Sequence, residues 1–257
     1  MDKKFIFTID DNIRFLRECN EKGYKSIFDH PYPNLLKRLH EKYSLKIQLN
    51  LFYKDDYFNL GMMQDRYRDE FKENADWLKL SFHSEFENVH PYREASFGKV
   101  RSDAQKVNSE IVRFAGERSL AKTTTVHYCT ATDGGILAIF ESGYRGLLGL
   151  YGSDDAPRTS YRNTEEEAKE MRLGKMIRKD GISYHGIDIV LNRFGIDEIK
   201  EQLAALRGRE IIKVMIHEQY FYQDYKAYQA DFEMKLDCTF SALSEYGYGS
   251  VFFEDII

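Results

Sequence analysis

Short apolar runs alternate with amphipathic helical segments along this sequence, and that alternation constrains the fold most strongly. The runs are rich in β-branched and aromatic residues and are bounded by charges or turn residues, as buried strands are. They occupy residues 3–9, 45–53, 76–83, 123–131, 145–152, 185–194, 210–217 and 249–257. Apolar residues at helical spacing predict helices over residues 12–23, 33–44, 62–74, 103–118, 135–142, 196–206 and 228–246. This order predicts parallel βαβ units.

Six to eight such units in one uninterrupted chain predict an α/β fold of the (β/α) barrel type, distorted or nearly closed, with about seven strands. A length of 257 residues is sufficient for one domain of this class. Only residues 152–170 interrupt the alternation, and their polar, turn-rich composition indicates a surface excursion rather than a linker. We therefore expect residues 1–257 to form a single domain.

Charge and cysteine content argue against several classes of function. The net charge is −5 and the Lys and Arg residues form no block, so nucleic acid is not an expected partner. Cys19, Cys129 and Cys238 are widely spaced and odd in number, which favours a reducing compartment over a disulfide framework. The N-terminus lacks an apolar segment of signal-peptide length, and no stretch reaches the roughly 20 apolar residues that span a bilayer. We expect a cytoplasmic protein without a membrane partner, and the sequence carries no indication of oligomeric state.

Titratable residues gather where predicted strands end. The first strand ends in Asp10 and Asp11, the third ends in His83, the fourth contains His127, and the strand over residues 210–217 ends in His217. In a parallel barrel, the carboxyl ends of the strands and the loops that follow them form the functional face. We therefore expect these side chains to lie on one face of the barrel.

Each of these residues also has an ordinary structural explanation. Adjacent aspartates after a strand commonly cap the next helix, and a single histidine at a strand end is commonly packed. Together, however, one Asp and two His form the donor set of a catalytic divalent metal with open positions. A second carboxylate beside it can accept a proton from water. At a sharp turn neighbouring residues point different ways, so one aspartate can bind the metal while the other faces the water.

Two motifs resemble those of the polysaccharide deacetylases with a NodB-like homology domain. The sequence FTIDD at residues 7–11 resembles the first motif of that family, an apolar strand that ends in two aspartates. The sequence VMIHEQYF at residues 214–221 resembles its last motif, a strand of the type Leu-x-His. The resemblance implies a distorted (β/α) barrel in which Asp10 is the general base, Asp11 a metal ligand and His217 the catalytic acid.

The second family motif is present with a longer spacing. In the family, a second histidine follows the first by four residues, whereas in SFHSEFENVHP, residues 81–91, His90 follows His83 by seven. The resemblance implies Asp11, His83 and His90 as the metal ligands, and Glu87, four residues after His83, is an alternative. The third family motif, an Arg-containing loop, has no counterpart, so the residue that orients Asp10 is not identified.

The resemblance implies a metal-dependent hydrolase that removes N- or O-acetyl groups from a carbohydrate. The ligand types favour Zn²⁺, with Co, Ni and Mn as alternatives. Asp10 would take a proton from water, and His217 would protonate the leaving amine. We expect His127, Tyr128 and Tyr220 to contact the substrate, since aromatic rings stack on sugars.

Other interpretations stay open. The altered second motif is compatible with a catalytically impaired, deacetylase-like protein that binds carbohydrate. A metal-independent glycoside hydrolase would pair Asp10 or Asp11 with Glu141, Glu218 or Asp224, about 5 to 9.5 Å away. Finally, Asp10 could cap a helix while the acidic excursion around Asp154 and residues 165–167 contacts another protein.

Overall fold

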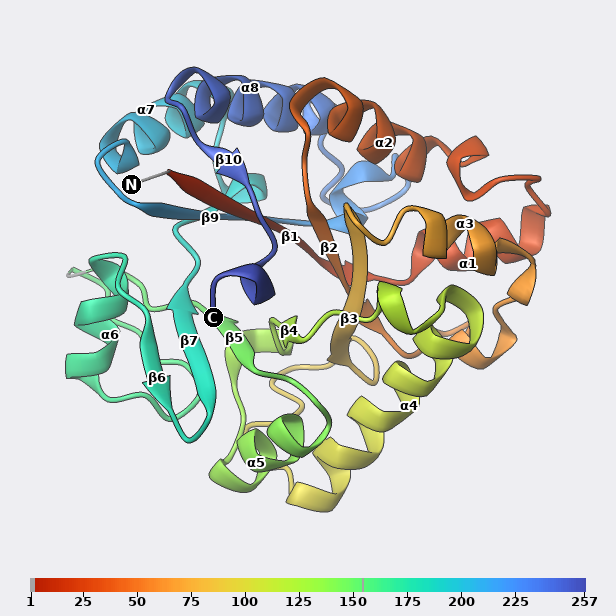
Figure 1. Cartoon of the computed structure of the whole chain (residues 1–257), viewed down its shortest axis with the longest axis horizontal. Helices are drawn as coiled ribbons and strands as arrows, with labels where there is room; N and C mark the ends of the chain where they lie inside the picture. The colour runs from red at the N-terminus through yellow and green to blue at the C-terminus, as the bar shows by residue number, and fades with distance from the viewer. Residues whose placement is uncertain (1–2, 154) are drawn as a thin grey trace.

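The computed structural model describes residues 3–153 and 155–257, so Asp154 lies outside the described residues. Its strands are β1 (Lys4–Asn12), β2 (Ile47–Phe52), β3 (Leu78–Ser84), β4 (Thr123–Thr124), β5 (Gly146–Gly149), β6 (Ile177–Lys179), β7 (Ile182–Gly186), β8 (Ile189–Val190), β9 (Ile211–His217) and β10 (Gly249–Ser250). Its helices are α1 (Arg14–Lys22), α2 (Pro31–Tyr43), α3 (Arg68–Glu73), α4 (Phe97–Ala115), α5 (Asp133–Glu141), α6 (Glu165–Arg172), α7 (Ile196–Leu206) and α8 (Phe232–Glu245). Figure 1 shows the helices arranged around the central strands.

The strands form two sheets, and nearly all neighbours are parallel. The first sheet has the order β3-β2-β1-β9-β8, with β10 paired to β1, and the second has the order β4-β5-β7-β6. Among the strands of the described ranges, β6 and β7 are the one antiparallel pair. A single bridge between Leu80 and Leu120 joins the first sheet to the segment before β4. Among the described strands no ladder joins β7 to β8, so the barrel is distorted and open on that side, as predicted.

The first strands have the sequence pattern of buried strands because both of their faces are covered. All six residues of β2 are buried, and so are seven of the nine residues of β1. The helix that follows β1 buries Phe15, Leu16 and Cys19 and ends at Gly23, whose φ of 65° is left-handed. These positions match the helical spacing of the sequence, and a glycine at this C-terminal position avoids the steric cost of a Cβ.

The predicted strand over residues 123–131 is wrong beyond Thr124. Its β-branched residues favour a strand, but the chain leaves the ladder and forms a 3₁₀ turn, η5 (His127–Cys129). Tyr128 and Cys129 have φ values of 62° and 55°, and the backbone N–H of Val126 donates to the hydroxyl of Tyr161 instead of to a neighbouring strand. The turn changes the direction in which His127 projects.

The C-terminal segment packs against the second sheet. Phe253, in the 3₁₀ turn η8 (Phe253–Asp255), is buried with Ile6 of β1 and Leu148 of β5. Its ring lies so close to Gly146 that a Cβ there would be 2.7 Å from Phe253 Cε1 and 2.8 Å from Thr123 Cγ2. Glycine at position 146 therefore allows the end of the chain to join the two sheets.

The excursion over residues 152–170 leads into regular structure. Helix α6 starts there with a capping box, in which Thr164 Oγ1 accepts from the N–H of Glu167 and the Glu167 carboxylate accepts from the N–H of Thr164. The β6–β7 hairpin follows α6. None of the helices in the described ranges combines the length and apolarity that crossing a bilayer requires.

Candidate metal and catalytic site

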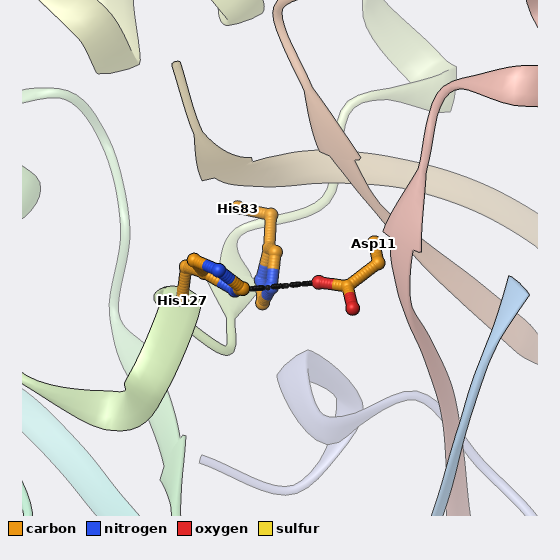
Figure 2. Close-up of side chains that lie close together, drawn as sticks. All are labelled: Asp11, His83 and His127. Atoms are coloured by element: carbon orange, nitrogen blue, oxygen red, sulfur yellow. Dashed lines mark hydrogen bonds and ion pairs between the residues drawn. The ribbon is translucent and has the colours of Figure 1, made fainter. Parts of the chain in front are cut away.

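Three side chains from distant parts of the sequence converge at the carboxyl ends of the strands. His83 Nε2 lies 3.0 Å from Asp11 Oδ1 and 3.0 Å from His127 Nδ1, and His127 Nδ1 lies 3.3 Å from Asp11 Oδ1. Figure 2 shows the three side chains pointing toward one another from β1, β3 and the turn after β4. Together they offer one carboxylate oxygen and two imidazole nitrogens, all within 4.8 Å of one another.

The backbone at the end of β1 aims Asp11 at this group. Asp11 has a φ of 61°, and the β1–β2 register shifts between Ile9 and Asn12. In a regular strand, neighbouring residues face opposite sides. The left-handed residue breaks that alternation, so Asp10 lies in the barrel interior while Asp11 faces His83.

Hydrogen bonds from surrounding groups fix the orientation of two of the three side chains. His83 Nδ1 donates to the carbonyl of Thr125, which leaves Nε2 with its lone pair toward Asp11 and His127 when the ring is neutral. Gln219 Nε2 donates to Asp11 Oδ2 over 2.7 Å, which leaves Oδ1 for the group. Bonds of this kind orient the ligands of metal sites.

Burial, hydrogen bonds and neighbouring charges shift the pKa values of all three side chains. Burial opposes ionisation of Asp11, but hydrogen bonds from His127 and His83 hold its pKa well below the usual range. Burial acts to lower the pKa of His83, yet the charges of Asp10 and Asp11 raise it overall. Burial lowers the pKa of His127. The carboxylates that raise the pKa of His83 would also stabilise a divalent cation at this point.

Asp10 is buried beside the group and is held by an asparagine. Its side chain is 2% exposed, and Asn50 Nδ2 of β2 donates to its Oδ1 over 2.6 Å. Burial raises the pKa of Asp10, while the charges of His83 and His217 and the bond from Asn50 act to lower it. Asn50 therefore takes the orienting position that the sequence left unassigned.

His217 lies next to Asp10 in the sheet. The two residues are register neighbours on β9 and β1. His217 Nδ1 is 2.8 Å from Asn192 Oδ1, which only accepts, so Nδ1 carries the proton and donates to Asn192. His217 Nε2 is then the nitrogen available to a reacting molecule.

Neither Asp10 nor Asp11 caps the helix that follows them. The Glu218 carboxylate does so, accepting from the backbone N–H groups of Ile13, Arg14 and Phe15. Glu218 follows β9 directly and is 1% exposed. The capping explanation for the two aspartates is therefore wrong, and their carboxylates are directed to the site.

His90 lies outside the group of three. From the resemblance we expected it to be a metal ligand together with Asp11 and His83. Its φ is 52°, and its ring packs on Tyr128 at 4.3 Å between centroids; Tyr128 also contacts His127, at 4.6 Å. The extra residues between His83 and His90 lengthen the loop, and Tyr128 separates His90 from the group. His127, expected among the substrate contacts, lies with Asp11 and His83 instead. Glu87 is exposed and lines the adjacent cleft.

A cleft of about 360 Å³ opens beside Asp11. Phe52, Phe86 and Tyr225 are its aromatic lining residues. Phe52 also packs on His83 and His127, at 5.3 and 5.0 Å between ring centroids. Of the expected substrate contacts, Tyr128 is 39% exposed above the histidines, and Tyr220 packs on His217 at 6.1 Å.

The carboxylates that a glycoside hydrolase would need are engaged elsewhere. Glu218 is a buried helix cap, Asp224 forms an ion pair with Arg14 at 2.7 Å, and Glu141 lies 3.3 Å from Arg101. Each of these three carboxylates thus has a partner of its own, whereas Asp11 contacts His83 and His127.

Sequence reasoning did not identify Asn50, Gln219, Asn192 and Thr125. Asn50 carried one weak signal: it is an amide within the apolar run over residues 45–53, where an unpartnered polar group would be costly. Gln219 lies two residues after His217, inside the matched last motif. Asn192 and the carbonyl of Thr125 had no distinguishing signal.

No protein-family model matches the sequence, and no curated protein matches it. Solved structures do. The Xyl-CE4 domain of a multidomain xylanase from the hindgut metagenome of Trinervitermes trinervoides is 12% identical, with a TM-score of 0.55 over 99% of this chain and 89% of that one. A family 4 acetyl xylan esterase from Clostridium thermocellum, in complex with a cobalt ion, is 14% identical, with a TM-score of 0.54 over 98% and 89%.

A 4-α-glucanotransferase from Thermococcus litoralis also matches, at 13% identity and a TM-score of 0.65. That match covers 99% of this chain but 40% of the transferase, so this chain spans about two fifths of its length. At these identities the matches report on the fold. They confirm the predicted fold, a distorted (β/α) barrel, which this chain shares with the Xyl-CE4 domain and the acetyl xylan esterase.

Proposed function

We propose that this protein is a metal-dependent hydrolase that removes acetyl groups from a carbohydrate. The observation that carries the proposal is the convergence of Asp11, His83 and His127 beside the second carboxylate of Asp10 and the imidazole of His217. The shared fold with an acetyl xylan esterase supports the reaction class.

The residues present fit a divalent ion. One carboxylate and two imidazoles are the donor set of catalytic zinc, and His83 already has the tautomer that a ligand needs. We propose Asp11, His83 and His127 as ligands and Zn²⁺ as the ion; the cobalt in the esterase structure keeps Co²⁺ as an alternative. When bound, a divalent ion supplies Lewis acidity at an acetyl carbonyl and lowers the pKa of a water molecule.

Asp10 and His217 have different roles in this proposal. Asp10 Oδ1 is held by Asn50, so Oδ2 accepts the proton that the attacking water loses. His217 Nδ1 donates to Asn192, so in the protonated ring Nε2 carries the second proton and delivers it to the leaving amine or alcohol, which leaves the ring neutral. The two groups are register neighbours, which keeps the proton acceptor and the proton donor on one side of the site.

The cleft beside Asp11 supports a sugar as the group that carries the acetyl. Phe86 and Tyr225, the two of its aromatic lining residues that are not buried, offer apolar surface next to the polar site. We keep Tyr128 and Tyr220 as substrate contacts at the rim. Whether the acetyl is attached through nitrogen or oxygen is decided by the assay below.

We also propose that the protein acts in the cytoplasm. Cys19 and Cys129 are buried and Cys238 is half-buried, and all three are unpaired. Unpaired cysteines are compatible with a reducing compartment.

Acetate release tests the function directly. The zinc-loaded protein is incubated with an acetylated chito-oligosaccharide and, separately, with acetylxylan, and free acetate is measured. We expect release from one of the two, loss of release after chelation, and recovery when zinc is added back. Asp10→Asn should retain the metal and lose activity by about 100-fold or more, because it lacks the proton acceptor. No acetate from either substrate, or release that survives chelation, would contradict the proposal.

A further inference from the structure

Asp10 depends on one side chain for its orientation. In the described part of the chain, Asn50 is the one side chain hydrogen-bonded to its carboxylate. We propose that Asn50 is a positioning residue for Asp10, and that a chain of hydrogen bonds from Thr123 through Gln48 holds the Asn50 amide. This inference rests on the proposed role of Asp10 as the proton acceptor.

This series of hydrogen bonds runs across the barrel interior from the second sheet to the first. Thr123 Oγ1 of β4 donates to Gln48 Oε1 over 2.8 Å, and Gln48 Nε2 donates to Asn50 Oδ1 over 2.8 Å. Asn50 Nδ2 then donates to Asp10 Oδ1 over 2.6 Å. Gln48 and Asn50 share one face of β2, since residues two apart in a strand point the same way.

The backbone carbonyl oxygen of Thr123 fixes which end of each amide donates in this series of hydrogen bonds, because that oxygen only accepts. Gln48 Nε2 also donates to the backbone carbonyl of Thr123 over 3.0 Å. A carbonyl oxygen only accepts, so the Gln48 amide nitrogen must face Thr123 and Asn50. Asn50 must then present Oδ1 to Gln48 and Nδ2 to Asp10. A reversed Asn50 amide would place an oxygen against the carboxylate.

Burial makes this arrangement difficult to replace. Asn50 and Thr123 are 0% exposed and Gln48 is 2% exposed, so bulk water does not compensate for a lost bond. Hydrogen bonds in series strengthen one another at low dielectric. Apolar side chains of similar size would fill this space without the cost of burying amides. The amides at positions 48 and 50 are therefore best explained by the carboxylate at the end of the chain.

Near-isosteric variants test the proposal without creating cavities. Asn50→Leu removes the donor to Asp10, and Gln48→Met removes the group that orients Asn50 without touching Asp10. Ser81→Ala is the matched control, because Ser81 is 0% exposed and donates to the same Thr123 carbonyl over 2.7 Å but does not bond Gln48 or Asn50. Wild type and the three variants are compared by hydrolysis of 4-nitrophenyl acetate and by metal content.

We expect Asn50→Leu to lower kcat by about tenfold to 100-fold, and Gln48→Met by a smaller factor, because a misdirected base loses much of its effect. KM and metal content should stay within about twofold of wild type in both, and Ser81→Ala should keep the wild-type kcat. If these buried polar groups served folding alone, each substitution, Ser81→Ala included, would lower activity in proportion to the fraction of protein that is folded. Wild-type kcat in both Asn50→Leu and Gln48→Met would overturn the inference.

The same measurements separate this inference from the proposed function. A wild-type protein that binds zinc and hydrolyses no acetyl substrate contradicts the function itself. An active wild type whose activity does not depend on positions 48 and 50 contradicts only the positioning role. If Asn50→Leu does not fold, Gln48→Met gives the result.

Discussion

The adjacent carboxylates Asp10 and Asp11 differ in their proton affinity because their surroundings differ. Burial raises the pKa of Asp10, whereas hydrogen bonds from two histidines, acting against burial, hold the pKa of Asp11 well below its usual range. Two adjacent residues thus hold a carboxyl group of raised pKa and one of lowered pKa side by side. Paired groups whose environments separate their pKa values are a common basis for dividing roles in an active site.

The role of His217 is tested with leaving groups of different basicity. A 4-nitrophenolate departs without a proton, whereas an amine or a sugar alkoxide needs one. We expect His217→Asn to lower acetate release from the acetylated sugar by about 100-fold or more and to change hydrolysis of 4-nitrophenyl acetate by only a small factor. The measurement is the ratio of kcat/KM for the two substrates.

Metal content controls for an indirect effect of that substitution. His217 is not among the three proposed ligands, so the variant should bind the metal as wild type does. Equal losses on both substrates would show that His217 does not act as the proton donor.

At the scale of single residues, motifs at strand ends predicted where Asp10, Asp11, His83 and His217 lie in the fold. The other histidine of the group could not be chosen from the sequence, because the resemblance to the second family motif implied His90, whereas the η5 turn places His127 with Asp11 and His83. Asn50 and Asn192 were not identified, since an amide within an apolar run does not reveal its partner. The catalytic and ligand roles of all these residues stay proposals.

Glu218 links three elements next to the site. It follows β9, caps the N-terminus of α1, and accepts from the hydroxyl of Tyr222 over 2.5 Å. Burial raises its pKa to about 7, against the bonds from Tyr222 and from the N–H groups of Ile13, Phe15 and Arg14. The β1–α1 turn that carries Asp11 therefore depends on a carboxyl group that titrates near neutral pH.

This raised pKa predicts a pH-dependent contribution to stability. Below the unfolded-state pKa of 4.5, Glu218 is protonated in both states, and its contribution is fully present. Between 4.5 and about 7 the folded protein retains a proton that the unfolded chain has lost, so the free energy of unfolding falls as pH rises. The fall amounts to about 3 kcal/mol over the whole interval.

Urea unfolding of wild type and Glu218→Gln at several pH values measures this term. The glutamine does not titrate, so the difference in unfolding free energy between the two proteins isolates Glu218. We expect the advantage of wild type to shrink from about pH 4.5 to about pH 8. An advantage that grows with pH would mean that the helix N-terminus holds the carboxylate ionised and that its pKa is not raised.

At the scale of elements, the helical spacing of apolar residues predicted element bounds more accurately than strand composition did. The helix over residues 196–206 was predicted from its apolar spacing with the bounds of α7. The prediction of a strand over residues 123–131 was wrong after Thr124. β-branched composition favours a strand but does not show that the Val126 N–H donates to the Tyr161 hydroxyl instead of to a neighbouring strand. The excursion over residues 152–170 looked irregular although its end begins α6.

On the scale of the whole molecule, the proposed metal site spans the two sheets. Asp11 and His83 belong to the first sheet, and His127 follows the first strand of the second. Near the site, the sheets are joined by the bond from the Ala121 N–H to the Leu80 carbonyl, at 2.9 Å, and by the bond from His83 to Thr125. A bound ion would join them further, and a ligand that binds only the folded state stabilises it. That residues 1–257 form one domain stays a prediction.

The most direct test of the proposed site is the metal content of purified wild type, His127→Ala and His90→Ala after zinc loading and removal of free ion, measured by mass spectrometry. The two variants each remove one of the two imidazoles that contact the Tyr128 ring. We expect about one equivalent in wild type and in His90→Ala, and loss of the metal in His127→Ala, because only His127 lies with Asp11 and His83. Loss in His90→Ala with retention in His127→Ala, or no zinc in wild type, would contradict the account.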